Sequence, residues 1–187
     1  MQLANIKDVN FIVLYGEPNA GKTTTLNELI ISLIHNNAEK IKVFKGTKED
    51  NNNFPDNEKL KLYLEQYSEK KKKYFKEFRN FIYFFKYKEK TILVITEGDD
   101  MLKLLGTLVH NFLYNKIDIV VCAAREEFLN DFVKDLLKIG VDVEHKVHKE
   151  PKEKEPDETK YDIANKDMAK KILEKIDNLI MIKKSGN

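Results

Sequence analysis

Apolar residues along the chain follow two patterns, one typical of strands and one typical of helices. Nearly continuous apolar runs over residues 11–15, 91–96 and 117–124 have the length of strands and predict strands buried on both faces. Residues 40–44 and 141–147 alternate between apolar and polar, which predicts strands with one face exposed to water. We therefore expect a sheet built from segments that are spread along the whole chain.

Between these strands, apolar residues recur at i, i+3, i+4 and i+7, which is the spacing of one helix face. The spacing predicts helices over about residues 22–36, 101–114 and 126–139, and a last helix over about residues 162–183. The last helix follows residues 149–160, a charged, proline-containing segment that we expect to be a linker or lid. The alternation of strands and helices predicts a three-layer α/β fold, with helices on both faces of the sheet and a C-terminal helix.

A hairpin is predicted in the middle of the chain. Residues 80–87 are aromatic and β-branched, and Lys88, Glu89 and Lys90 separate them from the apolar run 91–96. Two strand-like runs with such a short gap pair as antiparallel neighbours. We therefore expect a mostly parallel sheet of about five strands, to which the hairpin adds one antiparallel strand.

Residues 47–79 differ in composition from the rest and are expected to form a helical insertion. They begin with a polar, Asn-rich stretch, and residues 58–78 have a helical apolar stripe that a run of lysines interrupts. A basic helix with tyrosines is compatible with a nucleic-acid or partner surface. A solvated helix face explains the same charges more simply and is the preferred interpretation.

Composition bounds the class of protein. The chain has 187 residues, 42% of them hydrophobic and 34% charged, which suits one domain with an appendage. A net charge of +2 gives no overall field for nucleic acid or acidic membranes. The single cysteine, Cys122, excludes a disulfide within the chain, and no apolar stretch approaches the ~20 residues that span a bilayer. With no signal-peptide pattern in residues 1–11, we expect a cytoplasmic protein without a membrane partner.

The strongest motif lies between the first predicted strand and the first predicted helix, and it matches the phosphate-binding loop GxxxxGK[ST]. Its residues are Gly16, Glu17, Pro18, Asn19, Ala20, Gly21, Lys22 and Thr23, followed by Thr24. Gly16 lets the chain turn, and Gly21 lets backbone N–H groups approach phosphate oxygens. Lys22 supplies a positive charge to the β- and γ-phosphates, and the Thr23 hydroxyl is a ligand for Mg²⁺. The motif predicts binding of a nucleoside triphosphate with Mg²⁺, ATP by default.

Phosphate-loop enzymes also need an acidic residue after a buried strand, to hold Mg²⁺ directly or through water. The strand that ends in Thr96 has threonine where the acid usually stands. Either Glu97 or Asp99 reaches the metal from further along, or Thr23 and phosphate hold it alone. Asp99 and its neighbour Asp100 are equally suited to cap the next helix. We expect Glu97 and Asp99 to serve the metal and position water; without the usual Asp-Glu pair, fast hydrolysis is not supported.

One arginine stands at the end of a neighbouring strand. Arg125 follows the apolar run 117–124, and the chain has only one other arginine, Arg79. A planar guanidinium there suits a phosphate or carboxylate, although an ordinary surface arginine explains it equally well. We include Arg125 among the catalytic candidates with Lys22, Glu97 and Asp99. The scarcity of arginine argues against an ordinary nucleoside-monophosphate kinase.

Two other matches do not support a site. Residues 115–118 fit NKxD, the guanine-binding motif of GTPases, but they precede a strand where that motif follows one. His145 and His148 would point to opposite faces of an alternating strand, with no third ligand nearby, so zinc is not expected.

The segment GEPNAGKTTTLNELI, residues 16–30, resembles the P-loop NTPase superfamily. The layout is similar to small kinase-like ATP-binding proteins of bacteria and phages, several of which have strands similar to residues 95–99 and 118–123. The resemblance implies a P-loop NTPase sandwich over residues 1–148, with ATP and Mg²⁺ bound at residues 16–24.

Three functions fit these features. The first is slow, Mg-dependent ATP hydrolysis that controls a protein partner, and the missing Asp-Glu pair weakens it. The second is a kinase that transfers the γ-phosphate to a small molecule or a nucleic-acid end, which the missing arginine-rich acceptor site weakens. The third is a non-catalytic nucleotide-binding module whose interaction surface is the helix predicted over residues 58–78.

Overall fold

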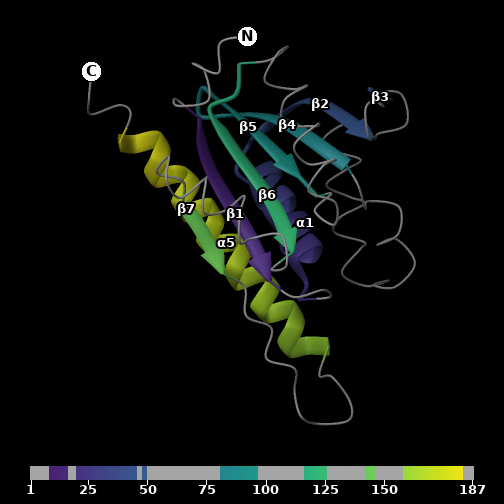
Figure 1. The fold of residues 1–187 in the computed structure, drawn as a ribbon. Helices are drawn as coiled ribbons and strands as arrows, with labels where there is room; N and C mark the ends of the chain where they lie inside the picture. The colour runs from purple at the N-terminus through teal and green to yellow at the C-terminus, as the bar shows by residue number, and fades with distance from the viewer. Residues whose placement is uncertain are drawn as a thin grey trace.

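The structure is a computed structural model of the whole chain. It describes residues 9–16, 20–45, 48–49, 81–96, 116–125, 142–145 and 158–182. The strands are β1 (Asn10–Gly16), β2 (Glu39–Lys45), β3 (Lys48–Glu49), β4 (Phe81–Tyr87), β5 (Lys90–Ile95), β6 (Ile119–Arg125) and β7 (Asp142–His145). The helices are α1 (Lys22–His35) and α5 (Glu158–Ile182), and all these elements are shown in Figure 1.

The strands form one sheet in the order β3-β2-β4-β5-β6-β1-β7. Strands β5, β6, β1 and β7 are parallel neighbours, whereas the pairs β4–β5, β2–β4 and β2–β3 are antiparallel. The α/β class and the mixed sheet are as predicted. The expected sheet was mostly parallel, with about five strands and an added antiparallel hairpin strand; the described residues form seven strands, and half of their pairings are antiparallel. β3 has only two residues, too few for any periodic pattern to reveal.

The predicted hairpin is confirmed, with a tighter turn than expected. Lys90 pairs with Tyr87, so the turn has two residues, Lys88 and Glu89, where the sequence suggested three. Their φ angles are 48° and 66°. Two-residue hairpin turns favour positive φ because their twist then matches that of the strands. The pairing with Tyr87 places Lys90 at the start of β5, although this polar residue lies outside the apolar run that predicted the strand.

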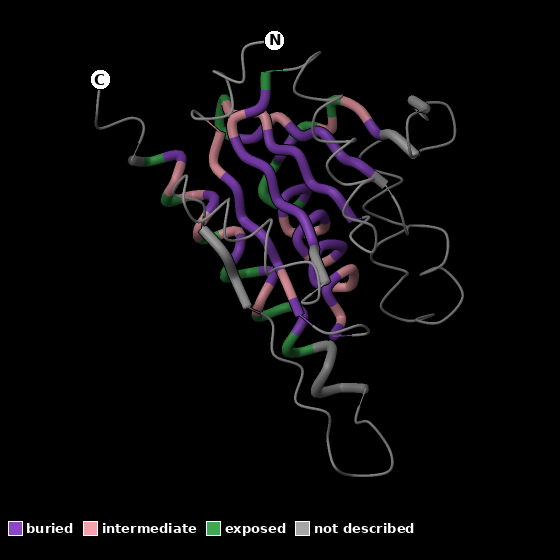
Figure 2. Tube along the Cα trace, viewed as in Figure 1, coloured by how far each residue is buried: buried purple, intermediate pink, exposed green. Residues whose placement is uncertain are grey.

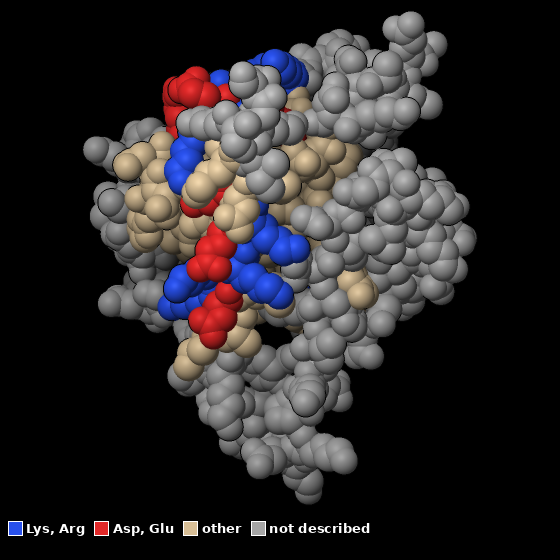
Figure 3. All heavy atoms as spheres, turned by 90° about the vertical axis from the view of Figure 1, so that its left-hand side faces the viewer, with Lys and Arg blue, Asp and Glu red and all other residues tan. Residues whose placement is uncertain are grey.

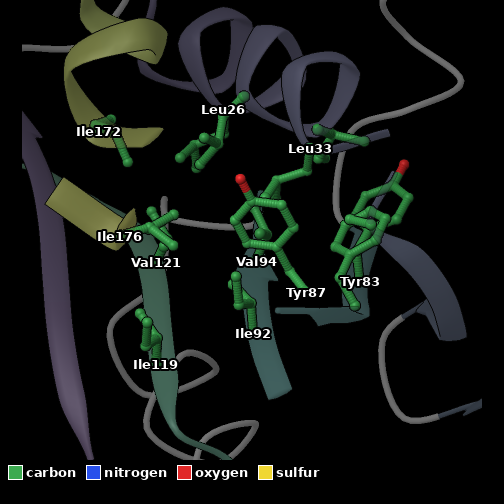
Figure 4. Close-up of a cluster of buried hydrophobic side chains, with 14 of the residues drawn as sticks. Leu26, Leu33, Tyr83, Tyr87, Ile92, Val94, Ile119, Val121, Ile172 and Ile176 are labelled. Atoms are coloured by element: carbon green, nitrogen blue, oxygen red, sulfur yellow. The ribbon is translucent and has the colours of Figure 1, made fainter. Parts of the chain in front are cut away.

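Both of the helices that the structure describes pack on the same face of the sheet. In Figure 4, Leu26 and Leu33 of α1 and Ile172 and Ile176 of α5 lie over Ile92, Val94, Ile119 and Val121 of the strands. Helix α1 buries residues at helical spacing and α5 buries the stripe Ala169, Ile172, Ile176 and Ile180. Helix α5 begins at Glu158, within the segment expected to be a linker. Residues 158–160 are Glu, Thr and Lys, which are polar and carry no apolar signal, so the pattern placed the start of the helix later.

The other face of the sheet is also buried. Its core residues are Phe11, Val13, Ile82, Phe84, Leu93, Ile95, Ile117, Val120 and Cys122. Figure 2 shows the burial running through the central strands. Burial on both faces explains why these strands are apolar without alternation. The helices predicted over residues 101–114 and 126–139, the insertion apart from β3, and residues 149–157 lie outside the described residues.

Candidate phosphate-binding site

The predicted phosphate loop joins the end of β1 to the start of α1. Gly21 precedes the helix with φ 76° and ψ 19°, a left-handed conformation that glycine adopts without a Cβ penalty. Its carbonyl accepts the Thr25 N–H at 2.9 Å, which forms the first turn of the helix. No side chain caps the helix start, and its first turn has no acidic residue. The N-terminal backbone donors and positive dipole end of α1 therefore lie beside the loop.

Lys22 occupies the first position of α1 and extends back toward β1. Its Nζ donates a hydrogen bond to the carbonyl oxygen of Gly16 at 2.8 Å, and the residue is only 7% exposed. Lysine is among the residues least often buried, because its ammonium is costly to remove from water. The side chain thus spans the loop from its end to its beginning and holds a positive charge inside it.

The carboxyl ends of three strands meet at this edge. Strand β6 lies between β1 and β5, and its last residue, Arg125, is the register partner of Gly16. After β1 the chain continues to β2, which lies on the same side of β1 as β6. After β6 it continues to β7, which lies on the opposite side of β1. Ligands of open α/β sheets bind at such a switch point, outside the carboxyl ends of the strands. Arg125 is therefore beside the loop at the level of its backbone; its side chain lies outside the described residues.

Thr96 follows β5 at the same edge. Ile92 and Val94 face the helices α1 and α5, so strand alternation puts Thr96 on that face too, where it is 2% exposed. A buried hydroxyl thus occupies the position at which phosphate-loop enzymes usually have an acid. Of the predicted metal ligands, Thr23 lies half-buried in the first turn of α1, while Glu97 and Asp99 are outside the described residues. Within the described ranges, no group of three or more His, Cys, Asp and Glu side chains could hold a metal ion.

The structure brings together six of the nine predicted loop residues. Gly16, Ala20, Gly21, Lys22, Thr23 and Thr24 are described, and Glu17, Pro18 and Asn19 are not. It also shows a contact that the sequence did not suggest. The hydroxyl of Thr25 donates a hydrogen bond to Oδ1 of Asn165 at 3.2 Å, and the two residues are 0% and 7% exposed. The available signal was a polar residue in line with the apolar stripe of α5.

The motif rejected as a guanine site lies at the opposite end of the sheet. The Asp118 carboxylate accepts the Thr91 N–H at 2.9 Å and an N–H of Lys90 at 3.3 Å, so it ties the start of β5 to the start of β6. This structural role accounts for Asp118 without a ligand. His145 of β7 is the register partner of Tyr15 of β1, and His148 is outside the described residues.

Cys122 is fully buried in the middle of the sheet and is not a candidate nucleophile. Burial raises the pKa of its thiol to about 12, so the thiol stays protonated at neutral pH. A thiol needs its ionised form to attack a substrate or bind a metal.

The outward face of α5 carries charges of both signs. Figure 3 shows Lys and Asp or Glu side chains intermixed along it. Intermixed charges produce no single-sign field, so this face gives no support to nucleic-acid binding. Neither of the described helices is long and apolar enough to cross a membrane.

These elements define an α/β protein in which a glycine-bounded loop joins a central parallel strand to a helix. Comparison of the chain with protein-family models, with curated proteins and with solved structures finds no match in any of the three. Assignment of function therefore depends on the geometry of this loop.

Proposed function

We propose that the chain is an ATP-binding P-loop NTPase that hydrolyses ATP slowly with Mg²⁺ and uses the bound state to control a partner. The observation that carries the proposal is the buried Lys22 ammonium, bonded to the Gly16 carbonyl across a loop that ends in left-handed Gly21. A strand, a glycine turn, a lysine and a helix start in this order fit a polyphosphate.

The loop residues have separate tasks in this proposal. The N-terminal backbone donors of α1 bind phosphate oxygens, and Lys22 exchanges its bond to a neutral carbonyl for a stronger one to an anion. Among the predicted metal ligands the structure describes Thr23, whose hydroxyl would hold Mg²⁺, and the ion would supply positive charge to the polyphosphate. Arg125, at the level of Gly16 in the neighbouring strand, is suited to the γ-phosphate.

Thr96 favours slow turnover, and it is also compatible with a second function, nucleotide binding without hydrolysis. A hydroxyl does not position or activate water as a carboxylate does. If neither Glu97 nor Asp99 compensates, the protein binds nucleotide without hydrolysing it and acts as an interaction module. Both functions require the same loop, so binding and turnover must be measured separately.

The deciding experiment is a turnover assay. The protein is incubated with Mg-ATP, alone and with mixed nucleosides, nucleotides and oligonucleotides, and the products are separated by chromatography. Lys22→Ala is the negative control, and Lys90→Ala is the matched control because Lys90 lies at the other end of the sheet, where it contacts Asp118. Phosphate release from ATP alone supports the slow ATPase, whereas a new phosphorylated species identifies a kinase.

A melting-temperature series completes the test. A rise with Mg-ATP but no product supports the interaction module, since a ligand that binds only the native state stabilises it. If Lys22→Ala responds to ATP as the wild type does, the loop is not the nucleotide site.

A further inference from the structure

Helix α5 carries a polar residue in its buried stripe. Ala169, Ile172, Ile176 and Ile180 pack on the sheet and α1, and Asn165 continues the stripe one turn earlier with 7% exposure. An apolar side chain at that position would extend the core without the cost of burying an amide. The presence of asparagine therefore indicates a specific partner.

That partner belongs to the phosphate loop's own helix. Asn165 accepts the hydroxyl proton of Thr25, three residues after Lys22, and the Thr25 N–H in turn bonds to the Gly21 carbonyl. Two hydrogen bonds thus connect the end of the loop to α5. Because Thr25 is 0% exposed, water does not compete for its hydroxyl.

A second polar contact holds α5 at the other end of the sheet. Asp177 accepts a hydrogen bond from Lys88 of the hairpin turn at 2.7 Å. Asn165 and Asp177 are twelve residues apart along α5, which corresponds to roughly 18 Å of helix. In Figure 1, α5 accordingly starts near the ends of β1 and β6 and runs back along the sheet.

A buried asparagine in an apolar seam has a simpler role, which is to fix the register of two helices. That role requires a polar partner anywhere along α1. The partner here is in the first turn after the loop, the turn that presents its N–H groups to a bound anion. A change at Asn165 therefore acts on the turn that carries Lys22 and Thr23.

We propose that Asn165 is a positioning residue that couples the phosphate loop to α5, so that nucleotide binding and docking of α5 strengthen each other. The proposal rests on the proposed function and identifies α5 as the element through which the bound state reaches a partner. The coupling is reciprocal: if docked α5 favours the loop geometry that binds nucleotide, nucleotide must favour docked α5 by the same factor.

The test compares asparagines on the same helix. Mg-ATP affinity is measured by titration calorimetry for the wild type, Asn165→Ala and Asn178→Ala, the last being an exposed position on α5. We expect Asn165→Ala to weaken binding about three- to tenfold, as the loss of one buried hydrogen bond would, and Asn178→Ala to leave it unchanged. Thr25→Val should reproduce the loss, and Thr25→Ser, which keeps the hydroxyl, should restore wild-type affinity.

Hydrogen exchange separates coupling from simple stabilisation. Mg-ATP should slow amide exchange along α5 in the wild type and in Asn178→Ala, but much less in Asn165→Ala. If Asn165→Ala lowers the melting temperature yet keeps wild-type affinity and nucleotide-dependent protection, Asn165 only fixes register and the proposal is overturned. If Asn165→Ala does not fold, the near-isosteric Thr25→Val decides by the same criteria. Wild-type protein that fails to bind Mg-ATP overturns the proposed function as well, which distinguishes the two failures.

Discussion

The two ends of the sheet use lysine in different ways. At the amino ends of β5 and β6, Lys88 and Lys90 donate to the carboxylates of Asp177 and Asp118, and their side chains are 46% and 28% exposed. At the carboxyl end, Lys22 is 7% exposed and bonds to a main-chain carbonyl of the loop that precedes it. The lysines at the amino end join separate elements to each other, whereas Lys22 at the carboxyl end holds its positive charge within the phosphate loop.

The difference separates charges that join elements from a charge that is held within the loop. The pairs at the amino end join the start of β5 to the start of β6 and attach α5 to the hairpin turn, and partly exposed pairs of this kind contribute little each. The Lys22 ammonium bonds to the carbonyl of Gly16 at the start of the loop, and the fold buries it beside the start of a helix, where anions are favoured. This buried charge at a helix start is the feature on which the proposed nucleotide site rests.

The largest expected effect is on nucleotide affinity. Lys22→Ala should weaken Mg-ATP binding by about 100-fold or more, because several charge-assisted hydrogen bonds to phosphate are lost. Lys90→Ala, the same change at the other end, should leave affinity as in the wild type, because Lys90 contacts Asp118 and not α5. Titration calorimetry on both variants, with circular dichroism to verify folding, checks the contrast. Equal losses in the two variants would contradict the division of roles.

Asp118 should affect stability alone. Asp118→Ala leaves the Thr91 N–H without its acceptor and is expected to lower the free energy of unfolding by about 1–2 kcal/mol. Urea denaturation measures the loss, and binding of Mg-ATP and Mg-GTP should both match the wild type. A change in the preference between the two nucleotides would instead assign Asp118 to base recognition.

Positive φ angles occur at both ends and permit a paired test. Gly21 has φ 76° and Glu89 has φ 66°, and only the first is glycine. Gly21→Ala should destabilise the protein by about 1 kcal/mol and weaken nucleotide binding, because alanine disfavours the left-handed conformation. Glu89→Gly should relieve the same cost, raise stability by up to about 1 kcal/mol and leave binding unchanged. Thermal and urea unfolding check the opposite signs; two destabilised variants would show that the Glu89 conformation is unstrained.

Local pattern was sufficient for the central part of the fold. The nearly continuous apolar runs of β1, β5 and β6 predicted strands buried on both faces, and the hairpin followed from two runs with a short gap. The antiparallel pairing of β2 with β4 was not predicted, because their partner residues are far apart in the sequence, as Val43 and Tyr83 are. No periodicity within one strand specifies which neighbour it takes.

The candidate site likewise has one part that the sequence predicts and one part that it does not. Contiguous residues predicted the loop from Gly16 to Thr24, since the turn, the lysine and the helix start follow one another along the chain. The Thr25–Asn165 contact spans 140 positions, and each residue alone is unremarkable in a helix. The packing of α5 on α1 brings Thr25 and Asn165 together. Each helix has its own apolar stripe, and neither stripe specifies the other as its partner.

The smallest expected effect is the pH dependence of the Lys88–Asp177 pair. The hydrogen bond to Asp177, followed by that to Tyr87, raises the pKa of Lys88 above its ordinary value of 10.5. A raised pKa means that the stabilisation is complete below pH 10.5 and is lost as the pH rises through the higher folded-state value. Asp177→Asn should therefore cost about 0.5 kcal/mol at pH 7, discounted because both side chains are partly exposed, and the difference from the wild type should shrink above pH 10.5. Urea unfolding of the wild type and of Asp177→Asn, at pH 7 and above pH 10.5, measures this difference in stability. A difference that persists after Lys88 loses its proton would show that Asp177 holds α5 through a contact other than this ion pair.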